Sequence, residues 1–348
     1  MIAVLDTAIY QFADCSQRFV GNTVEFTAPS VIPLPDLTRA TAHGVRGVLA
    51  RATNASVIDP TYRSTVAAAV RDGVAIGAYA YLRPTFDTAA AHVDAFITAV
   101  RDAGVIGVAP MADCETMHPV PAVNAGIEAE WAGRRYADWL HAWLDGVEGE
   151  LGRRPLIYTG AWWWNRMLAG CGAEFAGYDF VVSHYPHQPS TPGSVWPPVP
   201  PDATAWYQWA RTTQGGDAGV DSPNLPGGAT AWAGWQFTSA LRAADFGFSS
   251  SGGLDGNIVT DEAWARWTAR PASLRMPPTL RAGAQGHAVN ILQNVLNVWS
   301  AGQGRATTPF TNAWNAGLEA DLRWFQGFAG LGVDGVAGPK TWTALLRL

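Results

Sequence analysis

The 348-residue chain has little cysteine, and its cysteines are far apart. Cys15, Cys114 and Cys171 are an odd number at wide spacing. A disulfide-stabilised scaffold needs an even and dense set of cysteines, and a structural zinc site needs closely spaced ligands. We therefore expect free thiols, with one fortuitous pair as the alternative. The sequence also shows no cluster of metal ligands and no phosphate-binding loop, so we predict no cofactor.

Long apolar runs and clusters of basic residues are missing too. No stretch of about 18 apolar residues could span a membrane, and residues 1–6 are too short and lack the basic start of a signal peptide. The chain has 23 Lys and Arg against 29 Asp and Glu, and the resulting net charge of −6 offers no basic surface for nucleic acid. We expect no membrane insertion, no nucleic-acid partner and no export signal.

One apolar run, residues 108–115, ends in two acids. If the run is a strand, Asp113 and Glu115 lie on one face and Cys114 on the other, because side chains alternate. Ionising the second acid beside the first is unfavourable, so their pKa values are pushed apart and one acid can stay protonated while the other is charged. This pairing suits glycoside hydrolysis. The alternative is a strand that ends in two solvated acids.

Strand-like and helix-like patterns alternate over the first 269 residues. Strand-like segments fall at 2–5, 45–51, 74–82, 105–115, 155–158, 180–185, 235–239 and 254–258, and helix-like segments at 62–72, 89–103, 125–146 and 261–268. The alternation predicts a parallel sheet, and the number of strands favours a closed, modified TIM-like (β/α) barrel. Between residues 186 and 234 the rhythm fails in a Pro- and Gly-rich excursion, in which 206–209 has a strand-like pattern.

Four acids fall at the carboxyl ends of predicted strands, where barrels of this type carry their chemistry. They are Asp6, Asp113, Glu115 and Asp255. A structural role, in helix capping or a buried ion pair, is the alternative, and it suits Asp6 better than Asp255. The chain also has 17 Trp, three of them adjacent at 162–164, and their rings suit either core packing or stacking on sugar rings.

Beyond residue 270 the pattern changes to helices alone. A proline-bounded joint spans 270–278, and apolar residues then recur at helical spacing in three segments, the last beginning at Pro339. We therefore predict an α/β barrel over residues 1–269, a linker over 270–278, and a second, small all-α domain of three helices over 279–348.

Six segments in chain order resemble the motifs of the family 25 glycoside hydrolases, which are muramidases of the lysozyme type found in phage endolysins and bacterial autolysins. The segments are Ala3-Val4-Leu5-Asp6 with Tyr10-Gln11, Arg51-Ala52-Thr53 with Ile58-Asp59-Pro60, Gly77-Ala78-Tyr79-Ala80-Tyr81, Asp113-Cys114-Glu115, Trp235-Gln236-Phe237-Thr238-Ser239, and Leu254-Asp255-Gly256-Asn257. The carboxyl-terminal run Gly332-Val333-Asp334-Gly335, with Pro339-Lys340-Thr341-Trp342, resembles the three-helix peptidoglycan-binding module.

The resemblance implies hydrolysis of the β-1,4 bond between N-acetylmuramic acid and N-acetylglucosamine in peptidoglycan. Glu115 would be the general acid, with its pKa raised by an ionised Asp113. Asp113 would stabilise positive charge on the sugar or orient its acetamido group. Asp6 and Asp255 would complete an acidic floor. The candidate substrate contacts, which for the aromatic rings compete with core packing, are Tyr79, Tyr81, Tyr185, Trp235 and Arg51.

Three positions depart from the family pattern. Thr7 stands where the family commonly has serine, Asn54 where it has glutamate and Ala80 where it has histidine. A non-catalytic wall-binding protein on a degenerate barrel would explain the last two, and a barrel hydrolase acting on another amino-sugar polymer such as chitin is a further alternative. The preferred expectation is a monomeric phage endolysin that is made in the host cytoplasm, released by a holin-type protein, and acts on peptidoglycan.

Overall fold

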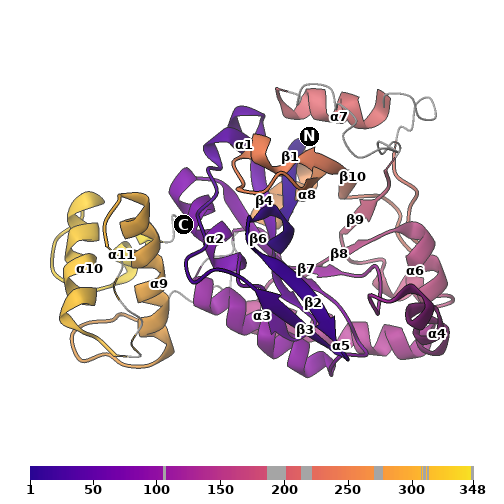
Figure 1. Cartoon of the computed structure of the whole chain (residues 1–348), viewed down its shortest axis with the longest axis horizontal. Coiled ribbons are helices and arrows are strands. Elements are labelled where there is room, and N and C mark those ends of the chain that lie inside the picture. Colours follow the sequence, from indigo (N-terminus) through magenta and orange to yellow (C-terminus); the bar gives the residue numbers. More distant parts are fainter. Residues whose placement is uncertain are drawn as a thin grey trace.

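The computed structural model describes residues 1–104, 107–185, 201–212, 222–269, 277–306, 308, 311 and 313–345. Its centre is a nine-stranded sheet in the order β1-β11-β10-β9-β8-β7-β6-β4-β5, and a further pairing of β1 with β4 closes eight of these strands into a barrel (Figure 1). The predicted modified (β/α) barrel is confirmed. The barrel strands are β1 (Ile2–Thr7), β4 (Val45–Asn54), β6 (Ala75–Tyr81), β7 (Met111–Asp113), β8 (Leu156–Thr159), β9 (Phe180–Ser183), β10 (Gly234–Arg242) and β11 (Gly253–Val259).

One strand runs against the others. β11 is antiparallel to both of its neighbours, β1 and β10, whereas the other barrel pairings are parallel. Asp255 therefore lies near the start of its strand and not at the carboxyl end, which corrects the prediction for this residue. Because the strand is reversed, its start lies at the open rim, and Asp255 is the register partner of Asp6. The two acids thus meet although their strands run in opposite directions.

Helices cover the outside of the barrel, and two of them differ from the predictions. The single helix expected over 125–146 is two helices, α4 (Pro121–Trp131) and α5 (Arg134–Leu151), which are separated at Gly133 with a φ of 83°. The strand-like pattern at 206–209 belongs to α7 (Ala203–Thr212), where Trp206 and Ala210 are buried at the i, i+4 spacing of a helix. The remaining helices of the barrel region are α1 (Thr38–Ala42), α2 (Tyr62–Asp72), α3 (Ala89–Ala103), α6 (Ala161–Met167) and α8 (Asp261–Thr268).

Several short elements lie between the barrel strands and helices. The strands β2 (Ser16–Val20) and β3 (Thr23–Thr27) form a separate hairpin, and β5 (Val57–Ile58) pairs antiparallel with the end of β4. Three 3-10 turns complete the barrel region: η1 (Ile9–Gln11), η2 (Gly172–Phe175) and η3 (Ala243–Phe246).

The barrel interior changes from apolar to polar along its axis. Val4, Leu49 and Met111 belong to one buried cluster that also contains Trp267 of α8. Side chains alternate along a strand, so the residues two positions later point to the same interior. Those residues are Asp6, Arg51 and Asp113. The sequence period therefore builds an apolar plug at one end and a polar layer at the open end.

The carboxyl-terminal helices form a small bundle beside the barrel (Figure 1). They are α9 (His287–Gly302), α10 (Ala316–Phe328) and α11 (Pro339–Leu345), and α9 packs against α2 and α3. At this contact the amide of Asn294 donates a hydrogen bond to the carbonyl of Asp102, and Val295 lies against Gly104. Of the predicted linker 270–278, residues 270–276 lie outside the described residues, as do 186–200 and 213–221 of the excursion.

The three cysteines are free, as predicted. Among the described residues, no helix is both long and apolar enough to cross a membrane.

Candidate active site

Four carboxyl groups meet at the open end of the barrel. Asp6 comes from β1, Asp113 ends β7, Glu115 follows two residues later, and Asp255 comes from β11. β7 is shorter than the predicted strand, but Cys114 continues its extended pairing by donating its amide to the Tyr158 carbonyl at 2.9 Å. Asp113 and Glu115 therefore keep the same side, as the alternation predicts.

The four acids lie at two depths. Asp6 and Asp113 are 6% and 5% exposed, whereas Glu115 and Asp255 are half-buried. The deeper pair forms the floor of the site, and the other two line its mouth. Of the four residues, Glu115 and Asp255 are therefore the more accessible to a molecule that enters from solvent.

Burial raises the pKa of every acid in the cluster, and repulsion by neighbouring carboxylates raises it further for Asp6, Asp113 and Asp255. Burial is the main cause for each of them, because it disfavours the charged form. The pKa of Asp6 is raised further by the charge on Asp255, and the pKa of Asp113 by the charges on Glu115 and Asp6. The pKa of Asp255 rises to about 7 through burial and the charge on Glu115. Such strongly coupled carboxyls titrate as one set.

Glu115 differs from the expectation in the cause of its raised pKa. Burial raises the pKa of Glu115, and a hydrogen bond from the Tyr81 hydroxyl and the charge of Arg83 both lower it. The pKa of Asp113 is the one raised by its acidic neighbour, and it lies well above its ordinary value. The direction needed for a general acid is therefore present at Glu115, but it comes from burial and not from an ionised Asp113.

Two predicted sugar platforms are hydrogen-bond donors to the acids. The hydroxyl of Tyr79 donates to Asp6, and the hydroxyl of Tyr81 donates to Glu115. Both tyrosines lie on β6, two residues apart, so they share the interior face. Tyr79 is 6% exposed and Tyr81 is half-buried, which places Tyr79 in the wall of the site rather than on an open surface.

Tyr185 reaches the site through a glutamine that the sequence analysis did not single out. The hydroxyls of Tyr185 and Tyr158 both donate to Oε1 of Gln236, the latter at 2.7 Å. Gln236 is buried in β10, and Tyr158 is the register partner of Asp113 in β8. Strand parity could have found both residues, because each lies on the interior face of a predicted strand.

Trp235 is not a sugar platform. Its side chain is fully buried in the cluster between the barrel and its helices, and its indole Nε1 donates to the carbonyl of His184 at 2.7 Å. The adjacent Gln236 faces the interior, so alternation turns Trp235 outward. We therefore remove Trp235 from the candidate substrate contacts.

Arg51 is bound by other side chains of the protein and does not face open space. It is 3% exposed, and its guanidinium bonds Asp59 through Nε at 2.9 Å and Nη2 at 2.8 Å. Nη2 also donates to Gln17 of β2 at 2.8 Å. Phe26 of β3 lies 5.7 Å from the guanidinium. The residue expected to contact substrate thus anchors the β2–β3 hairpin at the rim.

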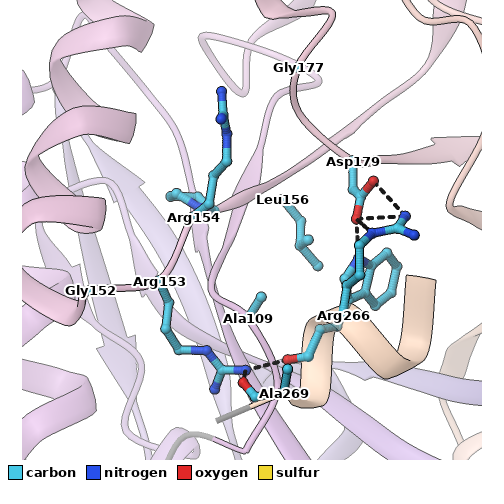
Figure 2. Close-up of a pocket in the computed structure, with 11 residues that line it drawn as sticks. Ala109, Gly152, Arg153, Arg154, Leu156, Gly177, Asp179, Arg266 and Ala269 are labelled. Atoms are coloured by element: carbon cyan, nitrogen blue, oxygen red, sulfur yellow. Dashed lines mark hydrogen bonds and ion pairs between the residues drawn. The ribbon is translucent and has the colours of Figure 1, made fainter. Parts of the chain in front are cut away.

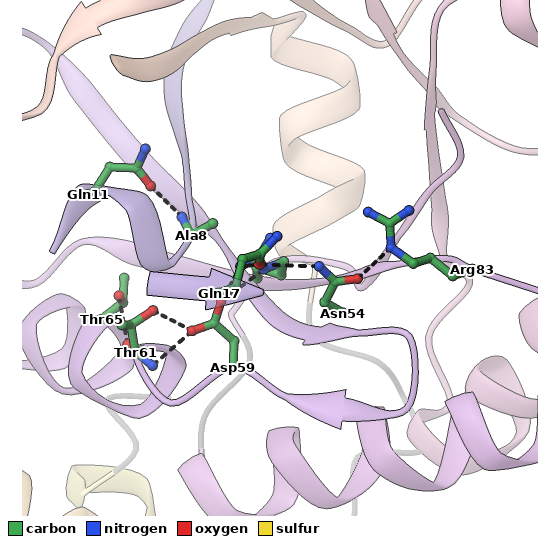
Figure 3. A network of polar contacts seen from close by, with 9 residues as sticks. Ala8, Gln11, Gln17, Asn54, Asp59, Thr61, Thr65 and Arg83 are labelled. Atoms are coloured by element: carbon green, nitrogen blue, oxygen red, sulfur yellow. Dashed lines mark hydrogen bonds and ion pairs between the residues drawn. The ribbon is translucent and has the colours of Figure 1, made fainter. Parts of the chain in front are cut away.

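Arg83 is a cation that faces the acid cluster, where Arg51 was expected to contact substrate. Its Nε donates to Oδ1 of Asn54 at 2.9 Å, and Asn54 in turn donates to Gln17 (Figure 3). The guanidinium lies 4.4 Å from the ring of Tyr81 and 4.8 Å from that of Phe19. Its Nη1 is buried and has no hydrogen-bond partner among the described residues. Asn54, where the family commonly has glutamate, therefore positions a cation that faces the acids.

A cavity lies at the end of the barrel opposite the acids. It has a volume of about 360 Å³ and lies where β8 begins, beside Leu156. Its carboxylate is paired with a cation: Asp179 accepts from Arg266 at 2.9 Å (Figure 2). Asp179 also accepts from the indole of Trp267 at 2.9 Å, and Arg153 donates to the carbonyl of Trp267. The crowded carboxyls are found only at the open end among the described parts of the chain, so we place the candidate active site there.

Comparison with protein families identifies the family of the chain. The model of "Glycosyl hydrolases family 25" matches residues 35–246, which is more than half of the chain. The chain belongs to glycosyl hydrolase family 25. The family 25 match includes Asp113 and Glu115, and a second model, "Putative peptidoglycan binding domain", matches residues 285–345, which cover α9, α10 and α11.

Solved structures show the same fold for the family 25 chain. The bacterial lysozyme from Streptomyces coelicolor is 18% identical with a TM-score of 0.51, covering 77% of this chain and 97% of that one. The muramidases from Trichobolus zukalii (19% identical, TM-score 0.50) and Acremonium alcalophilum (18%, TM-score 0.51) each cover 77% of this chain and 99% of theirs. No curated protein matches the chain in sequence.

Proposed function

We propose that this chain is a cell-wall lytic N-acetylmuramidase, which hydrolyses β-1,4 bonds between N-acetylmuramic acid and N-acetylglucosamine in peptidoglycan. The observation that carries the proposal is the cluster of four carboxyls in the barrel mouth of a family 25 chain that also matches a peptidoglycan-binding domain. Similar folds are named lysozyme and muramidase. We further propose that it acts as a monomer, since one chain supplies all four carboxyls.

Glu115 is the proposed general acid. It lies at the mouth, where its carboxyl can reach the glycosidic oxygen of a bound glycan, and burial raises its pKa so that it holds a proton at higher pH than an ordinary glutamate. As the bond between C1 and the glycosidic oxygen breaks, the proton of Glu115 moves to that oxygen. Positive charge then develops on the sugar ring that keeps C1.

Asp113 is the proposed stabiliser of that charge. It lies deeper than Glu115 on the same face, and its own pKa is raised because it is coupled to Glu115. The step uses the protonation state of the coupled set in which Glu115 holds the proton and Asp113 is the anion. The anion either stabilises the ring cation directly or orients the acetamido oxygen that attacks C1. Water then adds its hydroxyl to C1 and returns its proton to Glu115.

The test is mass spectrometry of peptidoglycan digested by the full chain. New reducing ends on muramic acid are expected. Reducing ends on glucosamine would show a glucosaminidase, and free peptides would show a different chemistry. A protein that pellets with cell walls and releases no reducing ends would instead be a wall-binding protein on an inactive barrel.

Glu115→Gln provides the matched control for this test. The amide has the shape of the acid but no proton to transfer, so we expect a loss of at least about 1,000-fold in release of reducing ends, together with an unchanged melting temperature or a raised one. Substantial remaining lysis by a folded Glu115→Gln protein would overturn the assignment of the acid.

A further inference from the structure

The three adjacent tryptophans at 162–164 have different surroundings. Trp163 and Trp164 are 1% and 0% exposed, and their indoles donate to Glu128 and to the carbonyl of Gly227. Trp162 is 69% exposed. Core packing thus accounts for two of the three rings and leaves the third on the surface without a packing role.

Trp162 lies at the open end of the barrel. It is the second residue of α6, which begins immediately after β8 and Gly160. A methyl group on Gly160 would come within 3.0 Å of both the Trp162 Nε1 and the hydroxyl of Ser183, the last residue of β9. The indole therefore lies against the carboxyl ends of β8 and β9, on the same rim as the acids.

An ion pair holds the ring of Trp162 from one side. The guanidinium of Arg166 lies 5.2 Å from the ring centroid, and Arg166 is itself paired with the buried carboxylate of Glu128. A cation over one face of an indole is attracted by the ring electrons and restricts the motion of the ring. With one side supported in this way and most of the ring exposed, the residue forms a fixed aromatic surface.

A second exposed ring lies across the mouth. Tyr10 in η1, just after β1, is 52% exposed, and the guanidinium of Arg51 lies 5.5 Å from its ring centroid. In the closed ring of eight strands, β1 and β8 are four positions apart in either direction, so they lie on opposite sides of the barrel. The acid cluster lies between the two rings, each of which carries an arginine.

We propose that Tyr10 and Trp162 are the outer sugar-binding platforms of an extended glycan cleft that crosses the barrel mouth over the acids. The inference rests on the proposed function and adds two residues that contact sugars beyond the pair at the cleaved bond. The C–H groups on one face of a pyranose ring pack on an aromatic ring with little conformational entropy to lose, since the ring is already held.

The first test compares long and short substrates. Soluble glycan strands freed of peptide are compared with the shortest oligosaccharide that the enzyme cleaves. For Trp162→Ala and Tyr10→Ala, kcat/KM on long strands should fall about tenfold each, while kcat/KM on the short substrate stays within about twofold. Trp162→Phe and Tyr10→Phe should restore most of the loss. Val31→Ala, which alters another highly exposed apolar side chain, is the control and should change neither value.

The second test does not depend on turnover. In the Glu115→Gln background, long glycan strands should bind about tenfold more weakly after Trp162→Ala, as measured by calorimetry. Unchanged binding, or equal losses of kcat/KM on long and short substrates, would overturn the platform proposal. If the wild-type chain releases no reducing ends while the binding difference persists, the proposed function fails and the platform proposal stands.

Discussion

Two clusters of buried charge lie side by side at the open end of the barrel, and they are built on opposite rules. In the Arg51–Asp59 network the two charges have opposite sign. Oδ2 of Asp59 accepts a hydrogen bond from Nε of Arg51 and forms an ion pair with its Nη2. Oδ1 of Asp59 accepts from the amide and hydroxyl of Thr61 at 2.9 and 2.7 Å (Figure 3). In the acid cluster four carboxyls repel one another, and Oδ1 of Asp113 has no hydrogen-bond partner among the described residues.

This difference distinguishes a cluster that stabilises the fold from a cluster that is suited to catalysis. Paired and fully hydrogen-bonded charges fix a geometry, here the rim that carries β2, β3 and β5. Crowded like charges cost stability and are found where a protein needs carboxyl groups that keep protons near neutral pH. Substitutions in the two clusters should therefore have opposite effects on folding.

The largest effect on stability is expected from Asp59→Ala. Asp59 is 1% exposed, and its removal leaves the guanidinium of Arg51 buried without its counter-charge. We expect the free energy of unfolding to fall by about 3–5 kcal/mol, measured by urea denaturation.

Asp138→Ala is the matched control for Asp59→Ala. Asp138 also pairs with an arginine, Arg134, but their side chains are 64% and 57% exposed. Solvent screens such a pair, so its loss should change the free energy of unfolding by less than about 1 kcal/mol. Equal losses for the two variants would mean that the buried network does not hold the rim.

Asp255→Asn should have a smaller effect of the opposite sign. The pKa of Asp255 is about 7 in the folded protein against an ordinary value of 3.8, so between these values the folded state binds a proton that the unfolded state has lost. Stability therefore falls as pH rises through this window, and an asparagine, which has no proton to lose, removes this fall.

The measurement compares wild type and Asp255→Asn by urea denaturation at pH 4 and pH 8. The advantage of the variant should grow by about 1–3 kcal/mol from the lower to the higher pH, a range reduced for the partial exposure of Asp255. A wild-type protein that gains stability over this range relative to the variant would contradict the raised pKa.

The barrel could be predicted because its signal is periodic, and the direction of one strand could not be read from periodicity. Only ten residues, 243–252, connect β10 with β11. A parallel pair needs a crossover of about a dozen residues or more, so the connection is too short for one. The predicted strands, 235–239 and 254–258, left residues 240–253 between them, which is long enough for a crossover and hid this sign. The prediction placed Asp255 on the correct rim, but it assumed that Asp255 ends a parallel strand, whereas the residue begins an antiparallel one.

The acids of the site were predictable, but their partners were only partly so. Asp6, Asp113, Glu115 and Asp255 stand at recognisable motif positions. The protonation order depends on Tyr81 and Arg83, which come from another part of the chain and approach Glu115 only in the folded barrel. The alternation of side chains along β10 predicts that Trp235 points away from the barrel interior. Nothing in the local sequence shows that the guanidinium of Arg51 pairs with Asp59.

Asn54 lies between the two clusters, and its replacement should change stability less than Asp59→Ala or Asp255→Asn. Its Oδ1 accepts from Arg83 at 2.9 Å, and its amide donates to Gln17 at 3.3 Å, so it links a cation that faces the acids to the hairpin (Figure 3). Asn54→Ala should lower the free energy of unfolding by about 1–2 kcal/mol and kcat on soluble glycan by about fivefold, because Arg83 loses its fixed orientation. Asn54→Asp keeps the acceptor and should recover most of kcat.

A pH–rate profile tests the link between Asn54 and Glu115. A displaced Arg83 no longer lowers the pKa of Glu115, so the basic limb of the profile should move to higher pH. An Asn54→Ala profile identical to wild type would confine Asn54 to the scaffold.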